Sequence, residues 1–238
     1  MLKRIFPEMT DRPENGMTFA MVFYGFIAFI LLPVYIVYMG VDVWDKTDML
    51  VWLELVYHGL GGVVVAVMFM SYLRDSFLNV QLFTKNFVKI VAIATAIMLT
   101  LALGLRFALG LAYPIHELTI TMYVGFMLEG QPLWSTLCLS LLSPFAVACI
   151  FYATGFAPLC CKKPWLGYLV VALVVAIPLA LDVNWRGGAE YALLTYLLQL
   201  PIHLIACWSY QKADTIWAPI TCLAIFNLVT SLLCLLPL

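Results

Sequence analysis

Charge is what this sequence most lacks. Of its 238 residues, 11% are Asp, Glu, Lys or Arg and 65% are hydrophobic, and the formal net charge is −1. Soluble domains carry roughly 25% charged residues, so this balance indicates a protein that lives in a membrane. The lipid bilayer is therefore the first expected partner, and a net charge this close to zero predicts no nucleic-acid partner.

Motifs that usually carry catalysis or metal binding are also missing. The chain has no HExxH or GxSxG sequence and no cysteines spaced as CxxC or CxxxC. Its last apolar run, residues 216–236, has no lysine that could form a retinal Schiff base. We therefore expect no bound metal and no cofactor.

The cysteines do not predict a disulfide framework. Five of the seven lie in apolar segments and the other two stand beside a pair of lysines: Cys138, Cys149, Cys160, Cys161, Cys207, Cys222 and Cys234. Disulfide frameworks use cysteines on exposed extracellular loops. We expect small buried side chains and one pair in a loop.

Long apolar runs dominate what is present. A helix needs about 20 apolar residues to cross the hydrocarbon core, and seven windows qualify: 17–40, 51–72, 86–112, 133–157, 165–183, 189–210 and 216–236. Because lipid tolerates no unpaired backbone groups, all seven should be helices. The predicted fold class is all-α: a polytopic integral membrane bundle of about seven transmembrane helices.

The domain organisation follows from these windows. Residues 1–16 are polar and form a cytoplasmic N-terminal segment, and residues 17–238 form a single transmembrane domain. The first window, residues 17–40, is longer than the roughly 7–15 apolar residues of a signal peptide, so we expect it to be retained. Two further stretches, residues 74–85 and 114–131, mix charged and apolar residues as helices at the membrane surface do.

Lysine and arginine placement predicts the orientation. With the N-terminus in the cytoplasm, the inside segments hold nine Lys or Arg residues and the outside loops hold two, Lys46 and Arg186. Cytoplasmic loops carry such an excess. We therefore expect a multi-pass protein of the cell membrane with its C-terminus outside.

Charged groups in the second and third windows form the first candidate site. Glu54 and His58 are four residues apart and share one helix face, and Arg106 lies at a similar depth in the next window. An ion pair between Arg106 and Glu54, with His58 nearby, would account for these charged residues within apolar windows as a structural feature. A substrate or ion site, or an arginine that reaches the outer surface, are the alternatives.

Polar residues in the last two windows form the second candidate site. Gln199 and His203 share a face of one helix, and Asn227 lies at mid-membrane depth in the next. Because a short turn joins the two helices, we expect His203 and Asn227 to meet in an interhelical hydrogen bond without a metal. A ligand or catalytic role is the alternative.

The last hundred residues, strongest over 133–238, resemble the CAAX-protease and bacteriocin-processing (Abi-type) family of intramembrane proteases. The segment HLIACWSYQKADTIWAPITCLAIFNLVTSLL, residues 203–233, has that family's aromatic helix, basic turn, Trp-Ala-Pro start and terminal asparagine. The segment SPFAVACIFYATGF, residues 143–156, aligns with the family's glutamate-pair motif through Pro144 and Phe151.

The catalytic residues that this resemblance implies are replaced. The two glutamates become Val147 and Ala148, the arginine becomes Tyr152, and the histidine before Asn227 becomes Leu223. A further FxxxH motif would fall in residues 175–182, where its histidine is Leu181, or where a one-residue shift offers Asp182. Valine and alanine cannot accept a proton as a general base does, so the resemblance implies a degenerate member with no catalytic residue.

Three functions remain open at this stage. The first is a non-catalytic binding or structural subunit of a membrane complex, with a membrane-protein or peptide partner, of the kind that serves bacteriocin immunity. The second is an active protease whose residues are displaced, with His203, Glu54 and His58 as candidates. The third is a small transporter or channel subunit that uses the polar groups within the membrane.

Overall fold

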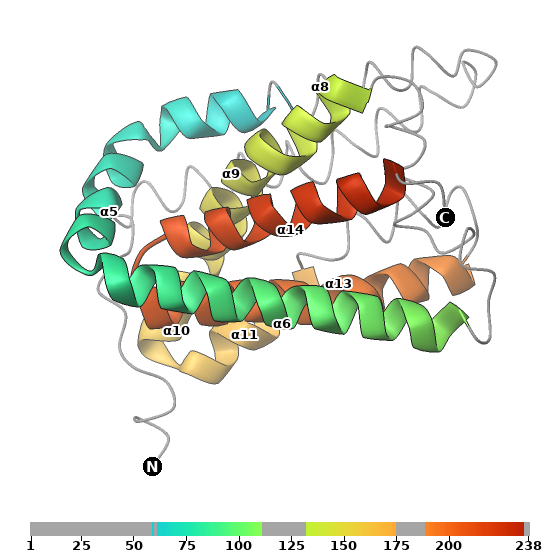
Figure 1. Cartoon of the computed structure of the whole chain (residues 1–238). Coiled ribbons are helices and arrows are strands. Elements are labelled where there is room, and N and C mark those ends of the chain that lie inside the picture. The colour runs from blue at the N-terminus through green and yellow to red at the C-terminus, as the bar shows by residue number, and fades with distance from the viewer. Residues whose placement is uncertain (1–58, 60, 111–131, 175–188, 236–238) are drawn as a thin grey trace, which may run out of the picture.

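The computed structural model of this chain describes residue 59 and residues 61–110, 132–174 and 189–235 (Figure 1). Every secondary-structure element in these ranges is a helix, which confirms the all-α class for this part of the chain. The first predicted window and the segment 114–131 lie outside the described residues.

The helices follow the predicted windows closely. A helix over Gly61–Met68 precedes the labelled elements. They are α5 (Met70–Leu82), α6 (Thr84–Gly110), α8 (Pro132–Leu137), η4 (Cys138–Leu142), α9 (Ser143–Val147), η5 (Ala148–Phe156), α10 (Ala157–Lys162), α11 (Pro164–Val174), α13 (Ala189–Ala213) and α14 (Trp217–Leu235).

Two of the described helices are long and apolar enough to cross a membrane, Thr84–Leu105 and Ser140–Lys162. A third joins them if Gly61–Met68 and α5 count as one broken span. The described part of the chain is therefore a helical bundle with two to three candidate membrane helices.

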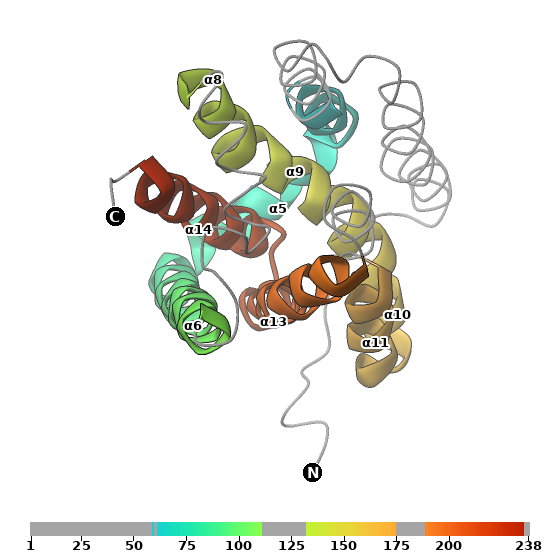
Figure 2. The same ribbon diagram turned by 90° about the vertical axis from the view of Figure 1, so that its right-hand side faces the viewer.

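The helix over residues 140–162 forms the centre of the bundle. It has 61% of its most apolar window buried, against 33% for Thr84–Leu105. Seen end-on, α9 lies near α14, and α10 and α11 lie beside α13 (Figure 2). Tyr152 and Phe156, both fully enclosed, belong to the hydrophobic core with Tyr210 of α13.

This central helix departs from α-helical geometry twice. Residues 138–142 and 148–156 are π-helical, a form that is rare and mostly limited to single turns. Pro158 has no backbone N–H to give to the carbonyl of Thr154. The N–H of Ala157 bonds instead to the carbonyl of Tyr152, five residues back, and the Thr154 hydroxyl donates to the carbonyl of Ile150. The wider turn rotates the side chains that follow it.

A sharp bend separates the second predicted window from α5. The helices over residues 61–68 and 70–82 meet at 75° around Phe69, so α5 crosses the end of the bundle (Figure 1). The sequence placed this change of direction after residue 72. The break comes three residues earlier because Tyr72 and Leu73 are already buried against the bundle as part of α5.

Candidate polar site in the core and at the end of the bundle

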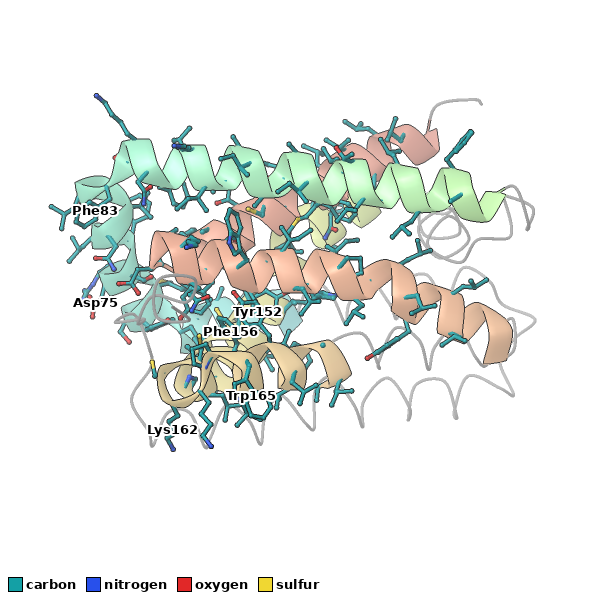
Figure 3. The ribbon with its side chains drawn as sticks, turned by 90° about the horizontal axis from the view of Figure 1, so that it is seen from below. Asp75, Phe83, Tyr152, Phe156, Lys162 and Trp165 are labelled. Carbon is teal, nitrogen blue, oxygen red and sulfur yellow. The ribbon has the colours of Figure 1, made fainter. Side chains whose placement is uncertain are left out.

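Tyr152 of the central helix and His203 of α13 form a polar contact between these two helices. The hydroxyl oxygen of Tyr152 lies 2.6 Å from Nδ1 of His203, and the rings meet edge to face with centroids 6.2 Å apart. Tyr152 comes from η5, and it lies between α13 and the α10–α11 layer (Figure 3). The bond can run in either direction, according to which histidine tautomer is present.

The structure gives His203 a partner that the sequence analysis did not name. Its Nδ1 lies against the hydroxyl of Tyr152, and the bond to Asn227 stays a prediction. Both Gln199 and Asn227 are half-buried on α13 and α14, and the backbone carbonyl of Asn227 accepts a bond from Thr230. A short turn makes two helices neighbours but does not fix their rotation, and that rotation decides which side chains meet.

The positions that the resemblance gives to catalytic groups are packed with apolar side chains. Ala148 is 0% exposed and Leu223 is 5% exposed, and both belong to the hydrophobic core. Val147 packs half-buried against the same core. Residues 175–182, where the second family motif would fall, lie outside the described residues.

The predicted ion pair cannot be placed. Arg106 lies on α6, but its side chain, like Glu54 and His58, is outside the described part of the chain. The pairing of Arg106 with Glu54 stays a prediction.

The cysteines of the apolar segments are buried as the sequence predicts: Cys138, Cys149, Cys207 and Cys222 are enclosed and form no disulfide. The expected loop pair is wrong, because α10 continues to Lys162, so Cys160 and Cys161 lie within the helix and Cys160 is buried. Within the described residues no three His, Cys, Asp or Glu side chains gather in a way that could hold a metal ion.

A second polar site, which the sequence analysis missed, lies where α5 meets the α13–α14 turn. The hydroxyls of Ser76 and Thr215 lie 2.9 Å apart, Thr215 also donates to the Ser76 carbonyl at 3.0 Å, and the N–H of Ile216 donates to Oγ of Ser76 at 3.2 Å. These groups are buried. Their donors and acceptors match one another, as buried polar groups require.

Further bonds extend this contact along α5. The Tyr72 and Tyr210 hydroxyls lie 2.5 Å apart, and the Asn79 amide donates to the carbonyl of Asp214 at 2.9 Å. The indole N–H of Trp217 donates to the carbonyl of Leu73 at 2.8 Å.

The turn itself is shaped for this contact. Asp214 has a φ of 50°, the left-handed conformation that ends a helix and that aspartate tolerates better than most residues. Phe77 and Phe145 meet the ring of Trp217 edge to face at 5.5 Å and 5.6 Å. The Trp-Ala-Pro stretch therefore serves here as an anchor between α5, α9 and α14.

Gln211 joins the turn to the opposite side of the bundle. It accepts a bond from the Tyr168 hydroxyl at 2.8 Å, and its amide donates to Sγ of Cys160 at 3.3 Å. The signal for this site was present in the sequence as a run of polar residues, SYQKADT, between two apolar helices. Nothing in the run indicates that α5 would be its partner, because α5 is more than a hundred residues away.

Comparisons with known proteins give no relatives: no family model, curated protein or solved structure matches this chain. The resemblance to the CAAX-protease family therefore depends on the quoted sequence motifs alone.

Proposed function

We propose that this protein is a non-catalytic, CAAX-protease-like membrane protein that serves as a binding or structural subunit of a membrane complex. In this proposal it crosses the membrane seven times, with its N-terminus in the cytoplasm and its C-terminus outside. An immunity-type role, in which it binds a membrane-protein or peptide partner, falls within the same proposal.

The observation that carries the proposal is the Tyr152–His203 contact. Where the resemblance expects an arginine, the phenol of Tyr152 engages the imidazole of His203 at 2.6 Å inside the core. This bond holds Nδ1 and fixes the orientation of the ring, and the positions that the resemblance gives to the two glutamates hold Val147 and Ala148, which cannot act as a general base. Ala148, next to that contact in the central helix, is fully enclosed. The arrangement suits a role in holding helices together.

The test is purification of the full-length protein from its own membranes in mild detergent. The expected result is a stoichiometric membrane-protein or peptide partner, resolved by chemical cross-linking and mass spectrometry. A partner retained by the H203L variant as well as by wild type supports the subunit role.

A different outcome identifies a protease. If purified wild-type protein cleaves a co-purified peptide, and H203L abolishes that cleavage while its fold survives, the non-catalytic proposal is wrong. Stoichiometric zinc in the wild-type protein that is lost in the H203L variant would also contradict the non-catalytic proposal.

A further inference from the structure

The most unusual exposed surface of the described residues is the α5–α6 corner, which we define as Leu78, Leu82, Phe83, Lys85 and Lys89. Leu82 and Phe83 are 73% and 61% exposed, and both lysines are exposed on the first turns of α6. Phe83 lies at the extreme end of the molecule (Figure 3). Large apolar side chains beside cations are typical of segments at the level of lipid headgroups.

The position of the corner relative to the membrane follows from α6. The corner leads directly into the candidate membrane helix Thr84–Leu105. If that helix spans the bilayer, the corner reaches the bilayer surface, where the side chains of Leu82 and Phe83 enter the boundary between headgroups and acyl chains. This step needs only the membrane placement and does not depend on the binding role proposed above.

Among the described residues, no acidic side chain pairs with the two lysines of the corner. Lys85 and Lys89 are four residues apart on one face of α6, and the 27 residues of α6 contain no Asp or Glu. Neither lysine forms an ion pair with any described residue, and the described ion pair at this end joins Arg74 to Asp75. Like charges at this spacing destabilise a helix, so an anion between them would be favourable.

The other described charged residues at this end of the bundle are also mostly basic. The α5–α6, α10–α11 and α13–α14 connections lie at one end (Figures 1 and 3). The described residues at and next to these connections include six basic ones against two acidic ones, Asp75 and Asp214: Arg74, Lys85, Lys89, Lys162, Lys163 and Lys212. A surface of anionic lipid is the complement of this charge.

We propose that the α5–α6 corner docks on anionic phospholipid, with Leu82 and Phe83 inserted at the acyl boundary and Lys85 and Lys89 bound to headgroup phosphates. A free phosphate would leave the two apolar side chains in water, and an acidic peptide would leave the corner's place at the end of a membrane helix unexplained. A lipid satisfies both the apolar and the cationic groups.

The experiment uses the full-length protein in micelles that contain equal amounts of phosphatidylglycerol and phosphatidylcholine, with retained lipids counted by native mass spectrometry. Wild type should retain phosphatidylglycerol preferentially. At low salt, the preference of the K85Q/K89Q variant for phosphatidylglycerol over phosphatidylcholine should be about fivefold lower than that of wild type for each lysine replaced. The K162Q/K163Q variant makes the same charge change at the same end of the bundle and should keep the preference.

Three outcomes overturn the proposal. One is a K85Q/K89Q variant that retains phosphatidylglycerol as wild type does. Another is an equal loss in K162Q/K163Q, which would assign the preference to the charge of the whole end. The third is a L82Q/F83Q variant that retains phosphatidylglycerol as wild type does, combined with displacement of that lipid by inorganic phosphate. That result would mean that the corner binds phosphate and does not insert into lipid. A folded L82Q/F83Q variant with weakened lipid retention supports the insertion.

Discussion

At the scale of single residues, the contact between Tyr152 and His203 makes a measurable prediction. A buried hydrogen bond between neutral groups contributes about 1 kcal/mol, and a partner left without a bond costs about 1–3 kcal/mol. We expect Y152F to lower the melting temperature by about 2–4 °C. The H203L and Y152F effects should be non-additive in a double-mutant cycle, with a coupling of about 1 kcal/mol.

The cycle also has a contradicting result. Additive effects within error would mean that the two side chains do not interact, although the structure places the phenol oxygen 2.6 Å from the imidazole nitrogen. A cycle between His203 and Asn227 tests the bond predicted from the sequence, and coupling between these two residues would confirm it.

Gly62 carries the second prediction at this scale. A Cβ at this position would lie 2.6 Å from the backbone carbonyl oxygen of Leu142 in η4. Backbone cannot move aside as a flexible side chain does, so G62A should push the 61–68 helix away from η4 and destabilise the fold by about 1–3 kcal/mol, the usual cost of an overpacked site.

Gly61 provides the matched control. A Cβ there would meet nothing within 4 Å, so G61A adds only the helix preference of alanine, about 1 kcal/mol in favour of the helix. Thermal unfolding of the two neighbouring variants in one detergent should therefore shift in opposite directions. Equal shifts would contradict the close approach of Gly62 to Leu142.

At the scale of elements, the docking of α5 rests on a few buried bonds. Ser76 accepts a bond from the N–H of Ile216 and shares a bond with the Thr215 hydroxyl. S76A removes both bonds that the buried Ser76 hydroxyl makes with the turn, which costs about 1–3 kcal/mol. We expect faster hydrogen exchange in α5 and in the α13–α14 turn, measured by mass spectrometry.

Ser71 serves as the control for this variant, because it lies on the same helix and is exposed. S71A should leave the exchange of both segments unchanged. If S76A also changes nothing, the contact between Ser76 and the turn does not hold α5 in place.

Helix existence was predictable from the sequence at this scale, and helix geometry was not. Apolar length alone located α6, α13 and α14 to within a few residues, because a long apolar run without helix-breaking residues favours a helix. The π-helical turns of residues 138–142 and 148–156 were not predicted. An apolar run has the same composition whether its turns are α-helical or π-helical, and Thr154 and Pro158 give only a local hint of the change.

The candidate site was predictable in part for the same reason. His203 was identified because a histidine within an apolar helix is costly, but its contact with Tyr152 was not predicted. Tyr152 looked like a replaced arginine in an alignment, and nothing in its sequence surroundings indicates the rotation that turns it toward α13. The site formed by Ser76 and Thr215 was missed because its two halves are about 140 residues apart, as the separation of 139 shows.

At the scale of the whole molecule, the remaining prediction is the orientation of the bundle. Basic residues gather at one end of the described helices, on α5, at the start of α6, at the α10–α11 connection and at the end of α13 (Figure 1). If this end faces the cytoplasm, as the positive-inside tendency expects, a cysteine placed at Lys162 should be labelled only from the cytoplasmic side. A cysteine at Lys46, which lies outside the described residues, should be labelled only from the opposite side. The C161S background is needed because Cys161 is half-buried beside Lys162, whereas Cys160 is buried. The two labels measure whether an odd or an even number of crossings separates the positions, so labelling of both from one side would rule out the seven-span arrangement.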